Sequence, residues 1–170
     1  YFMGRAEYVP WAEQASETIA DRQPLAGERL MIAGSSLNHR GLHQALEIHG
    51  ATVTAEDDWW GSRSAGENIA EESSDLMKSV FEKYYLDTPS PRLFPFDIAD
   101  AWFQQASTDG IEGVVFYLPP EDCVAGWDYP SRRRYLDERG IPHLLVREDA
   151  RSISAECHGR MESFVRSIGV

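Results

Sequence analysis

The sequence contains only two cysteines, Cys123 and Cys157, among its 170 residues. Two thiols are too few for a disulfide scaffold, so we expect a reducing, cytoplasmic location. No apolar run approaches the roughly 18 residues that span a bilayer, and we find no signal-peptide pattern, so no membrane association is expected. The first residue is Tyr1 rather than Met, and we therefore expect an upstream part of the protein to be missing.

Basic residues are also scarce. The chain has 16 Lys and Arg against 28 Asp and Glu, which gives a formal net charge of -12. Nucleic acids and anionic membranes bind through clustered Lys and Arg, so neither is an expected partner. A small anionic ligand is compatible with this charge only where a local basic group or a helix N-terminus offsets the overall field.

Short apolar segments alternate with amphipathic segments along the chain. The predicted strands are residues 30–33, 51–55, 112–118 and 143–146, and the predicted helices are residues 6–20, 38–49, 71–86, 97–107, 128–139 and 153–168. Continuous apolar strands between helices are typical of a parallel sheet covered on both faces. We predict an α/β fold, a Rossmann-like or flavodoxin-like three-layer sandwich with a mostly parallel four-stranded sheet. Residues 1–27 are predicted to link to an upstream domain, and 28–170 to form a single domain.

In such sheets, ligands bind beyond the carboxyl ends of the strands. Residues 34–37 could form a simple tight turn or present backbone N–H groups to an anion, and Ser35 and Ser36 are the candidate substrate-binding residues. The segment has neither the GxGxxG pattern nor the Lys-Ser/Thr ending of a P-loop. The loop 56–63 carries paired acids, for acid–base chemistry or simply for a solvated turn, and Arg63, a candidate anion ligand.

Cys123 lies in a third loop, after the most hydrophobic predicted strand. It could be a nucleophile, a metal ligand or a residue without function. The adjacent Glu121 and Asp122 disfavour the thiolate that a nucleophile needs, whereas a soft-metal ligand tolerates acidic neighbours once the metal is bound. Cys157 falls on the apolar stripe of the last predicted helix, which indicates a buried hydrophobe.

Other polar clusters carry weaker signals. His39 and His43 are four residues apart on one predicted helix, but they lack the Glu of a zincin motif and a third ligand. The three arginines 132–134 are predicted to lie on a solvated helix face, with phosphate contact as the alternative.

Several segments resemble one known family. The segments "GIEGVVFYLPPEDCVAGWDYPSRRRYLDERGIPHLLVRED" (110–149), "RLMIAGSSLNHRGLHQALEIHGATVTAEDDWWGSR" (29–63) and "GRMESFVRSI" (159–168) are similar to the C-terminal part of the 2-hydroxyacyl-CoA dehydratase and benzoyl-CoA reductase family, of the 2-hydroxyglutaryl-CoA dehydratase D-component type. The shared features are a strand leading to a Cys-containing loop, a DYP helix start, a GIP turn and an R-x-E closing helix. Positions 59–61 and Ser90 depart from the cysteines that many relatives carry there.

The resemblance implies a subunit of an oxygen-sensitive cytoplasmic enzyme of anaerobic metabolism. Such a subunit works with a second homologous subunit and an ATP-dependent activator protein, and it passes one electron from a [4Fe-4S] cluster to an acyl-CoA thioester. Cys123 would be a cluster ligand, and the cluster is not expected to assemble on this segment alone. The alternatives are a non-catalytic paralogue that serves as a scaffold and a module that binds a small anionic ligand.

Overall fold

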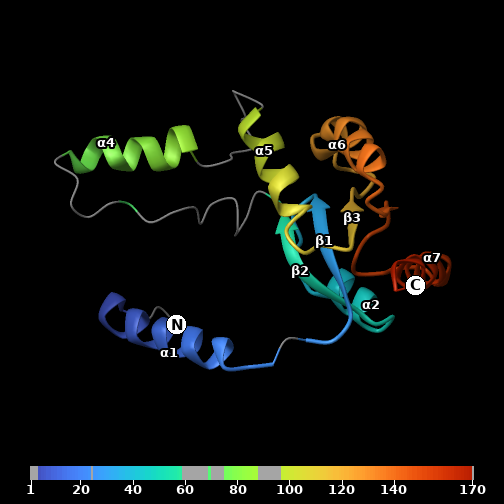
Figure 1. Cartoon of the computed structure of the whole chain (residues 1–170), viewed down its shortest axis with the longest axis horizontal. Coiled ribbons are helices and arrows are strands. Elements are labelled where there is room, and N and C mark those ends of the chain that lie inside the picture. Colours follow the sequence, from blue (N-terminus) through green and yellow to red (C-terminus); the bar gives the residue numbers. More distant parts are fainter. Residues whose placement is uncertain (1–3, 24, 59–68, 70–74, 88–96, 170) are drawn as a thin grey trace.

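The apolar residues that precede the predicted anion-binding turn at 34–37 belong to β1 (Glu28–Gly34). This is an inner strand of a parallel sheet. The computed structural model describes residues 4–23, 25–58, 69, 75–87 and 97–169. In these residues the strand order is β2–β1–β3–β4, with β2 at Ala51–Asp57, β3 at Gly113–Tyr117 and β4 at His143–Val146. Every paired strand runs parallel to its neighbour, which confirms the predicted sheet (Figure 1).

Helices cover both faces of the sheet. On one face lie α2 (Gly41–Glu47) and α7 (Ala155–Ile168), and on the other lie α5 (Asp97–Ala106) and α6 (Ala125–Arg139) (Figure 1). Alternate residues of β1 therefore enter two different cores, and the last five residues of the strand are all buried. This double burial explains why the strands are continuously apolar rather than alternating in polarity. The three-layer sandwich predicted from the sequence is confirmed.

The two cores are built mainly from aliphatic and aromatic side chains. The core under α2 and α7 includes Leu30, Ile32, Leu42, Leu46, Val115, Met161 and Val165, and the core under α5 and α6 includes Met31, Phe103, Val114, Phe116 and Leu136. The rings of Phe103 and Phe116 lie 6.0 Å apart between centroids. Burying each large side chain contributes about 1.5–3 kcal/mol, so these cores hold the strand ends in fixed positions.

Three predicted helix boundaries differ from the structure. The helix predicted to start at Asp128 is α6, which begins at Ala125, so Pro130 lies inside the helix rather than in its first turn. The second helix was predicted to begin near Asn38, but α2 begins at Gly41 with Arg40 at its N-cap, and the Asn38 side chain accepts a hydrogen bond from Arg151. The helix predicted at 71–86 is α4 (Leu76–Phe81) followed by η1, a π-helix at Glu82–Asp87, and residues 71–74 lie outside the described part.

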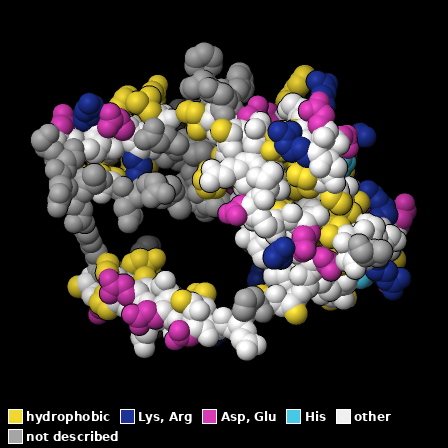
Figure 2. Space-filling view, in the orientation of Figure 1, with side chains coloured by type: hydrophobic (Ala, Val, Ile, Leu, Met, Phe, Trp, Pro, Cys, Tyr) yellow, Lys and Arg dark blue, Asp and Glu magenta, His cyan; other side chains and the backbone are white. Residues whose placement is uncertain are grey.

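The helices α1 (Arg5–Ala20) and α4 lie apart from the sandwich (Figure 1). Both carry exposed hydrophobic side chains, which Figure 2 shows on their surfaces, among them Tyr8, Trp11 and Met77. The predicted helix at the start of the chain is thus confirmed, while the proposed boundary between residues 27 and 28 stays a prediction.

Of the helices in the described ranges, none is long and apolar enough to cross a bilayer.

Candidate functional site

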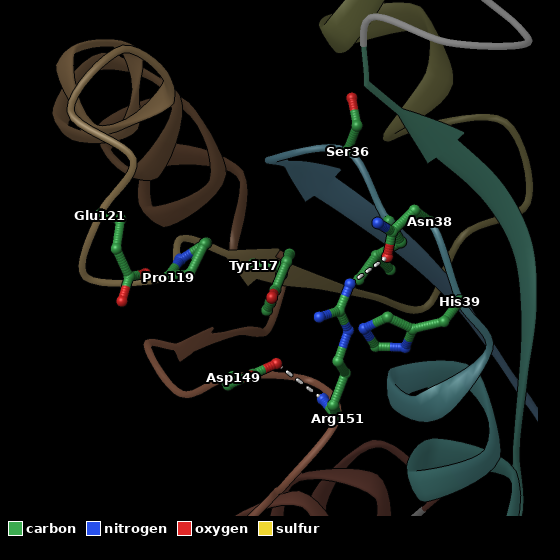
Figure 3. A pocket seen from close by; sticks show the side chains of 9 residues that line it. Ser36, Asn38, His39, Tyr117, Pro119, Glu121, Asp149 and Arg151 are labelled. Atoms are coloured by element: carbon green, nitrogen blue, oxygen red, sulfur yellow. Dashed lines mark hydrogen bonds between the residues drawn. The ribbon is translucent and has the colours of Figure 1, made fainter.

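A cavity of about 620 Å³ opens at the carboxyl edge of the sheet. Its walls come from the segments that follow β1, β3 and β4, as Figure 3 shows. The lining residues are Ser36, Leu37, Asn38, His39, Tyr117, Pro119, Glu121, Asp149 and Arg151. The sequence rule for parallel sheets predicted two of these segments, 34–37 and 119–127. The segment after β4 was missed, although the same rule applied to the fourth predicted strand would have found it.

The turn from β1 into the site depends on Gly34, whose φ is +116°. A Cβ built there would lie 2.5 Å from the carbonyl oxygen of Tyr117 on β3, so only glycine allows the two strands to end so close together. The next backbone N–H, from Ser35, donates to that same Tyr117 oxygen at 2.9 Å. The end of β1 is therefore fixed directly against the end of β3.

The two predicted substrate-binding serines differ in their surroundings. Ser35 is buried, and its hydroxyl donates to the Oδ2 atom of Asp122 at 2.6 Å. Ser36 lines the cavity, and its buried Oγ has no hydrogen-bond partner among the residues that the structure describes. Ser35 is thus committed to joining two loops, while Figure 3 shows the Ser36 hydroxyl pointing away from the other labelled residues of the cavity. Their role in substrate binding stays a prediction, and Arg63 lies outside the described residues.

Asp122 organises the loop that carries the candidate metal ligand. Besides the Ser35 hydroxyl, it accepts hydrogen bonds at Oδ1 from the backbone N–H groups of Val124 at 2.8 Å and Ala125 at 3.0 Å. Burial opposes ionisation of this carboxyl, but the three hydrogen bonds outweigh burial and lower the pKa of Asp122 below its usual range. An ionised Asp122 therefore caps the start of α6 and ties it to β1.

Cys123 lies between two residues of this hydrogen-bonded turn and is exposed. Exposed hydrophobic side chains adjoin it, including Val124 and Trp127, the latter 84% exposed. Cys157 is 1% exposed within the core under α7, which confirms the prediction of a buried hydrophobe. Burial, and then the nearby Glu148, raise the pKa of the Cys157 thiol, and Cys123 is the thiol that is accessible from outside the protein.

No group of three or more His, Cys, Asp or Glu side chains in the described ranges could hold a metal ion. His39 lines the cavity, whereas His43 pairs with Glu56 at 2.6 Å. If Cys123 holds a metal group, the further ligands of that group must therefore come from outside the described residues.

Arg132 links α6 to the end of β2. Its Nη1 atom lies 2.8 Å from Oδ2 of Asp57, and the two side chains are 6% and 0% exposed. Its guanidinium carbon lies 4.8 Å from the centre of the Phe103 ring. The prediction that residues 132–134 form a solvated face is wrong for Arg132, because the buried carboxylate on β2 supplies the partner that draws it inward. The sequence alone gave no signal for this pairing across 75 residues.

By its fold the chain is an α/β sandwich with a cysteine in a loop at the carboxyl edge of its sheet. Comparison with known proteins shows which family it belongs to. The family model for the D-component of 2-hydroxyglutaryl-CoA dehydratase matches residues 1–168. The chain therefore belongs to the 2-hydroxyglutaryl-CoA dehydratase D-component family, which confirms the resemblance seen in the sequence.

Two curated relatives are similar to this chain at low identity. The (R)-phenyllactyl-CoA dehydratase beta subunit of Clostridium sporogenes is 22% identical over 88% of this chain and 40% of its own length. The beta subunit of (R)-2-hydroxyglutaryl-CoA dehydratase from Acidaminococcus fermentans is 19% identical over 99% of this chain and 46% of its own length. The chain thus spans less than half the length of either relative.

Proposed function

We propose that this chain is part of a beta-type subunit of a cytoplasmic 2-hydroxyacyl-CoA dehydratase of anaerobic metabolism, and that Cys123 is one ligand of a [4Fe-4S] cluster. The family membership and the two dehydratase relatives favour dehydration over reduction of an aromatic ring, as in benzoyl-CoA reductases. The proposed partners are a second homologous subunit, an ATP-dependent activator protein and an acyl-CoA substrate. The observation that carries the proposal is the exposed Cys123 thiol at the edge where parallel sheets bind ligands.

The residues around Cys123 suit a ligand role better than a nucleophilic role. A [4Fe-4S] cluster is usually held by about four cysteines, and Cys157 is buried in the core, so the other ligands would come from outside this chain. The cluster would thus be shared between two parts of the assembly. When bound, the cluster supplies one-electron transfer to the acyl-CoA thioester.

This chain's own contribution is to hold the thiol in place. The three hydrogen bonds to Asp122 fix the backbone on both sides of Cys123, and two prolines at 119 and 120 stiffen the preceding turn. The exposed Trp127 and Val124 beside the thiol provide an apolar surface against which the rest of the assembly could exclude water.

The test is the iron content of the complete protein with its partner subunit, purified without oxygen. Iron and acid-labile sulfide are measured for the wild type, for Cys123→Ser and for Cys123→Ala. We expect both variants to lose the roughly four irons of one cluster. Cys157→Ala is the matched control, because it removes the other thiol from the core, and it should keep the iron.

An unchanged iron content in both Cys123 variants would exclude the ligand role. A wild type without iron would favour the non-catalytic scaffold, which keeps the fold and loses the cluster. In either case, screening would move from CoA thioesters to binding partners.

A further inference from the structure

The cavity at the carboxyl edge contains a cation that no described carboxylate neutralises. The Arg151 guanidinium makes no ion pair within the described ranges, and its one side-chain hydrogen bond runs from Nη2 to Oδ1 of Asn38 at 3.4 Å. A guanidinium has five N–H donors, so most of them remain uncommitted. Figure 3 shows this group pointing into the cavity toward Tyr117.

Two further donors lie beside the guanidinium. Because Oδ1 of Asn38 accepts from Arg151, the amide nitrogen of Asn38 is left to donate. The Nδ1 atom of His39 accepts from the backbone N–H of Gly41 at 3.1 Å, which assigns the proton of the neutral ring to Nε2. The side chains of Arg151, Asn38 and His39 thus form a corner that is rich in donors, all three lining one cavity.

The cavity wall also contains two carboxylates. Figure 3 shows Glu121 across the cavity from Arg151, and Asp149 beside Arg151 on the same loop, where its Oδ1 accepts the Arg151 backbone N–H. The chain as a whole carries a net charge of -12, so a polyanion would be repelled. The walls therefore suit a small molecule with one oxyanion and with hydroxyl groups that can donate to these two carboxylates.

The Arg151 loop is held in place before any ligand binds. Oδ1 of Asp149 accepts the backbone N–H of Arg151 at 2.9 Å, and the buried N–H of Ala150 donates to the Tyr117 hydroxyl at 3.4 Å. On the inner side, a Cβ at Gly41 would collide with the Ala150 carbonyl oxygen, so this loop packs closely against the start of α2. A guanidinium on such a fixed loop binds an anion with a smaller entropic cost.

We propose that this cavity binds a small hydroxylated metabolite with a phosphate or carboxylate group. The oxyanion contacts Arg151, the Asn38 amide and the His39 ring, and hydroxyl groups of the ligand donate to Glu121 and Asp149. The volume of about 620 Å³ is typical of small-molecule sites. This site uses side chains rather than the backbone of residues 34–37, and it does not depend on the proposed iron–sulfur role.

The test is isothermal titration of the complete protein, with its partner subunit, against three probes. Glycerol 3-phosphate combines the oxyanion with hydroxyls, inorganic phosphate has only the oxyanion, and glycerol has only the hydroxyls. We expect saturable binding that is tightest for glycerol 3-phosphate and absent for glycerol. Hydrogen exchange should show ligand-induced protection at residues 36–39 and 147–151.

Arg151→Gln should weaken the binding of glycerol 3-phosphate at least tenfold. Arg151→Lys keeps the charge but loses the planar guanidinium that donates two parallel hydrogen bonds, and its affinity should be intermediate. Arg147→Gln is the matched control, because it removes the same charge from an exposed position on the same loop. It should bind within about twofold of the wild type. Iron content is measured in parallel and should be unchanged in Arg151→Gln, which separates this site from the cluster.

No saturable binding of either phosphate probe below about 10 mM would overturn the proposal. Equal affinities of Arg151→Gln and the wild type, or an equal loss in Arg147→Gln, would also overturn it. The last outcome would reveal a general effect of charge rather than a defined site.

Discussion

Asp122 connects the end of β1 to the start of α6 through a single carboxylate. Its oxygens accept from the Ser35 hydroxyl, at the end of β1, and from two backbone N–H groups at the start of α6. Cys123, the proposed ligand, is the next residue along the chain. The position of that thiol is therefore set by hydrogen bonds that the neighbouring acid makes, and not by contacts of the cysteine itself.

Asp122→Ala should lower the free energy of unfolding by about 1 kcal/mol, the usual cost of losing a capping side chain. The backbone N–H groups of Val124 and Ala125 lose their acceptor, and the Ser35 hydroxyl loses its partner. Urea denaturation measures this loss. Glu121→Ala is the control, since it removes a neighbouring exposed acid and should change stability by less than about 0.5 kcal/mol. Equal effects of the two variants would contradict a capping role.

The stability that Asp122 contributes should depend on pH. An aspartate in an unfolded chain titrates near pH 3.9, and the hydrogen bonds lower the pKa of Asp122 in the folded protein. Its contribution is therefore fully present above about pH 4 and is lost as the pH falls through the lower, folded pKa. The difference in unfolding free energy between wild type and Asp122→Asn should stay constant from about pH 7 to pH 5 and narrow below about pH 4.

Ser35→Ala provides the check on this linkage, because it removes the hydrogen bond to Oδ2 of Asp122. In the Ser35→Ala background, the pKa of Asp122 should lie closer to its usual value. The difference in unfolding free energy between Asp122 and Asp122→Asn at neutral pH should then be smaller than in the wild-type background. A difference that widened with falling pH would show that the folded protein does not favour the ionised carboxylate.

At the scale of elements, the buried pair of Arg132 and Asp57 joins α6 to β2. Arg132→Met should cost about 3 kcal/mol, because it leaves a fully buried carboxylate without its 2.8 Å partner. Arg133→Met is the matched control one residue along the same helix. It breaks an exposed pair with Asp137 and should cost no more than about 0.5 kcal/mol.

The combination of Arg132→Met with Asp57→Asn should cost less than the sum of the two single changes, because each single change already removes the same buried ion pair. Urea denaturation of the four proteins gives this coupling. Strictly additive effects would contradict a direct interaction between the two side chains.

The junction of β1 and β3 offers a test of backbone geometry. Gly34→Ala should destabilise the protein by at least about 2 kcal/mol, since strain at positive φ is joined by overlap with the Tyr117 carbonyl oxygen. Gly50 also has positive φ, +93°, but a Cβ there would have nothing within 4 Å. Gly50→Ala should therefore cost only about 1 kcal/mol. Thermal unfolding measures both losses, and the difference between them is the cost of the steric overlap at Gly34. Equal losses would contradict the close approach of the strands.

At the scale of the whole molecule, the sheet was predictable because its pattern is local. Short strand segments rich in apolar residues, alternating with helices, are enough to predict a parallel sheet and to place Cys123 at its carboxyl edge. Contacts between distant residues were not predictable in the same way. The pairing of Arg132 with Asp57, and the use of Asn38 by Arg151 rather than by α2, depend on loop paths that no periodicity encodes.

The family resemblance supplied what the residues alone could not. From the residues, Cys123 could be a nucleophile, a metal ligand or neither, and the motifs around it favoured the cluster ligand only through the family. The structure adds the exposure of Cys123 and the burial of Cys157, so Cys123 is the one accessible cysteine of this chain.

Alkylation of the two thiols should distinguish three states of the protein: iron-bound, folded without iron, and unfolded in urea. With iron bound in the complete protein, Cys123 as a cluster ligand should resist alkylation, and Cys157 should resist it because the core covers it. After a chelator removes the iron from the folded protein, Cys123 alone should react with iodoacetamide. Both should react in urea, because Cys157 becomes accessible only when the core under α7 opens.

Mass spectrometry of the peptides that contain each cysteine distinguishes these states. Rapid labelling of Cys157 in the folded, iron-free protein would contradict its place in the core, whatever the role of Cys123. Rapid labelling of Cys123 while the iron is still bound would instead leave the fold intact and remove Cys123 from the ligand set. The same experiment therefore separates an error in the packing of the whole molecule from an error in the proposed function of one residue.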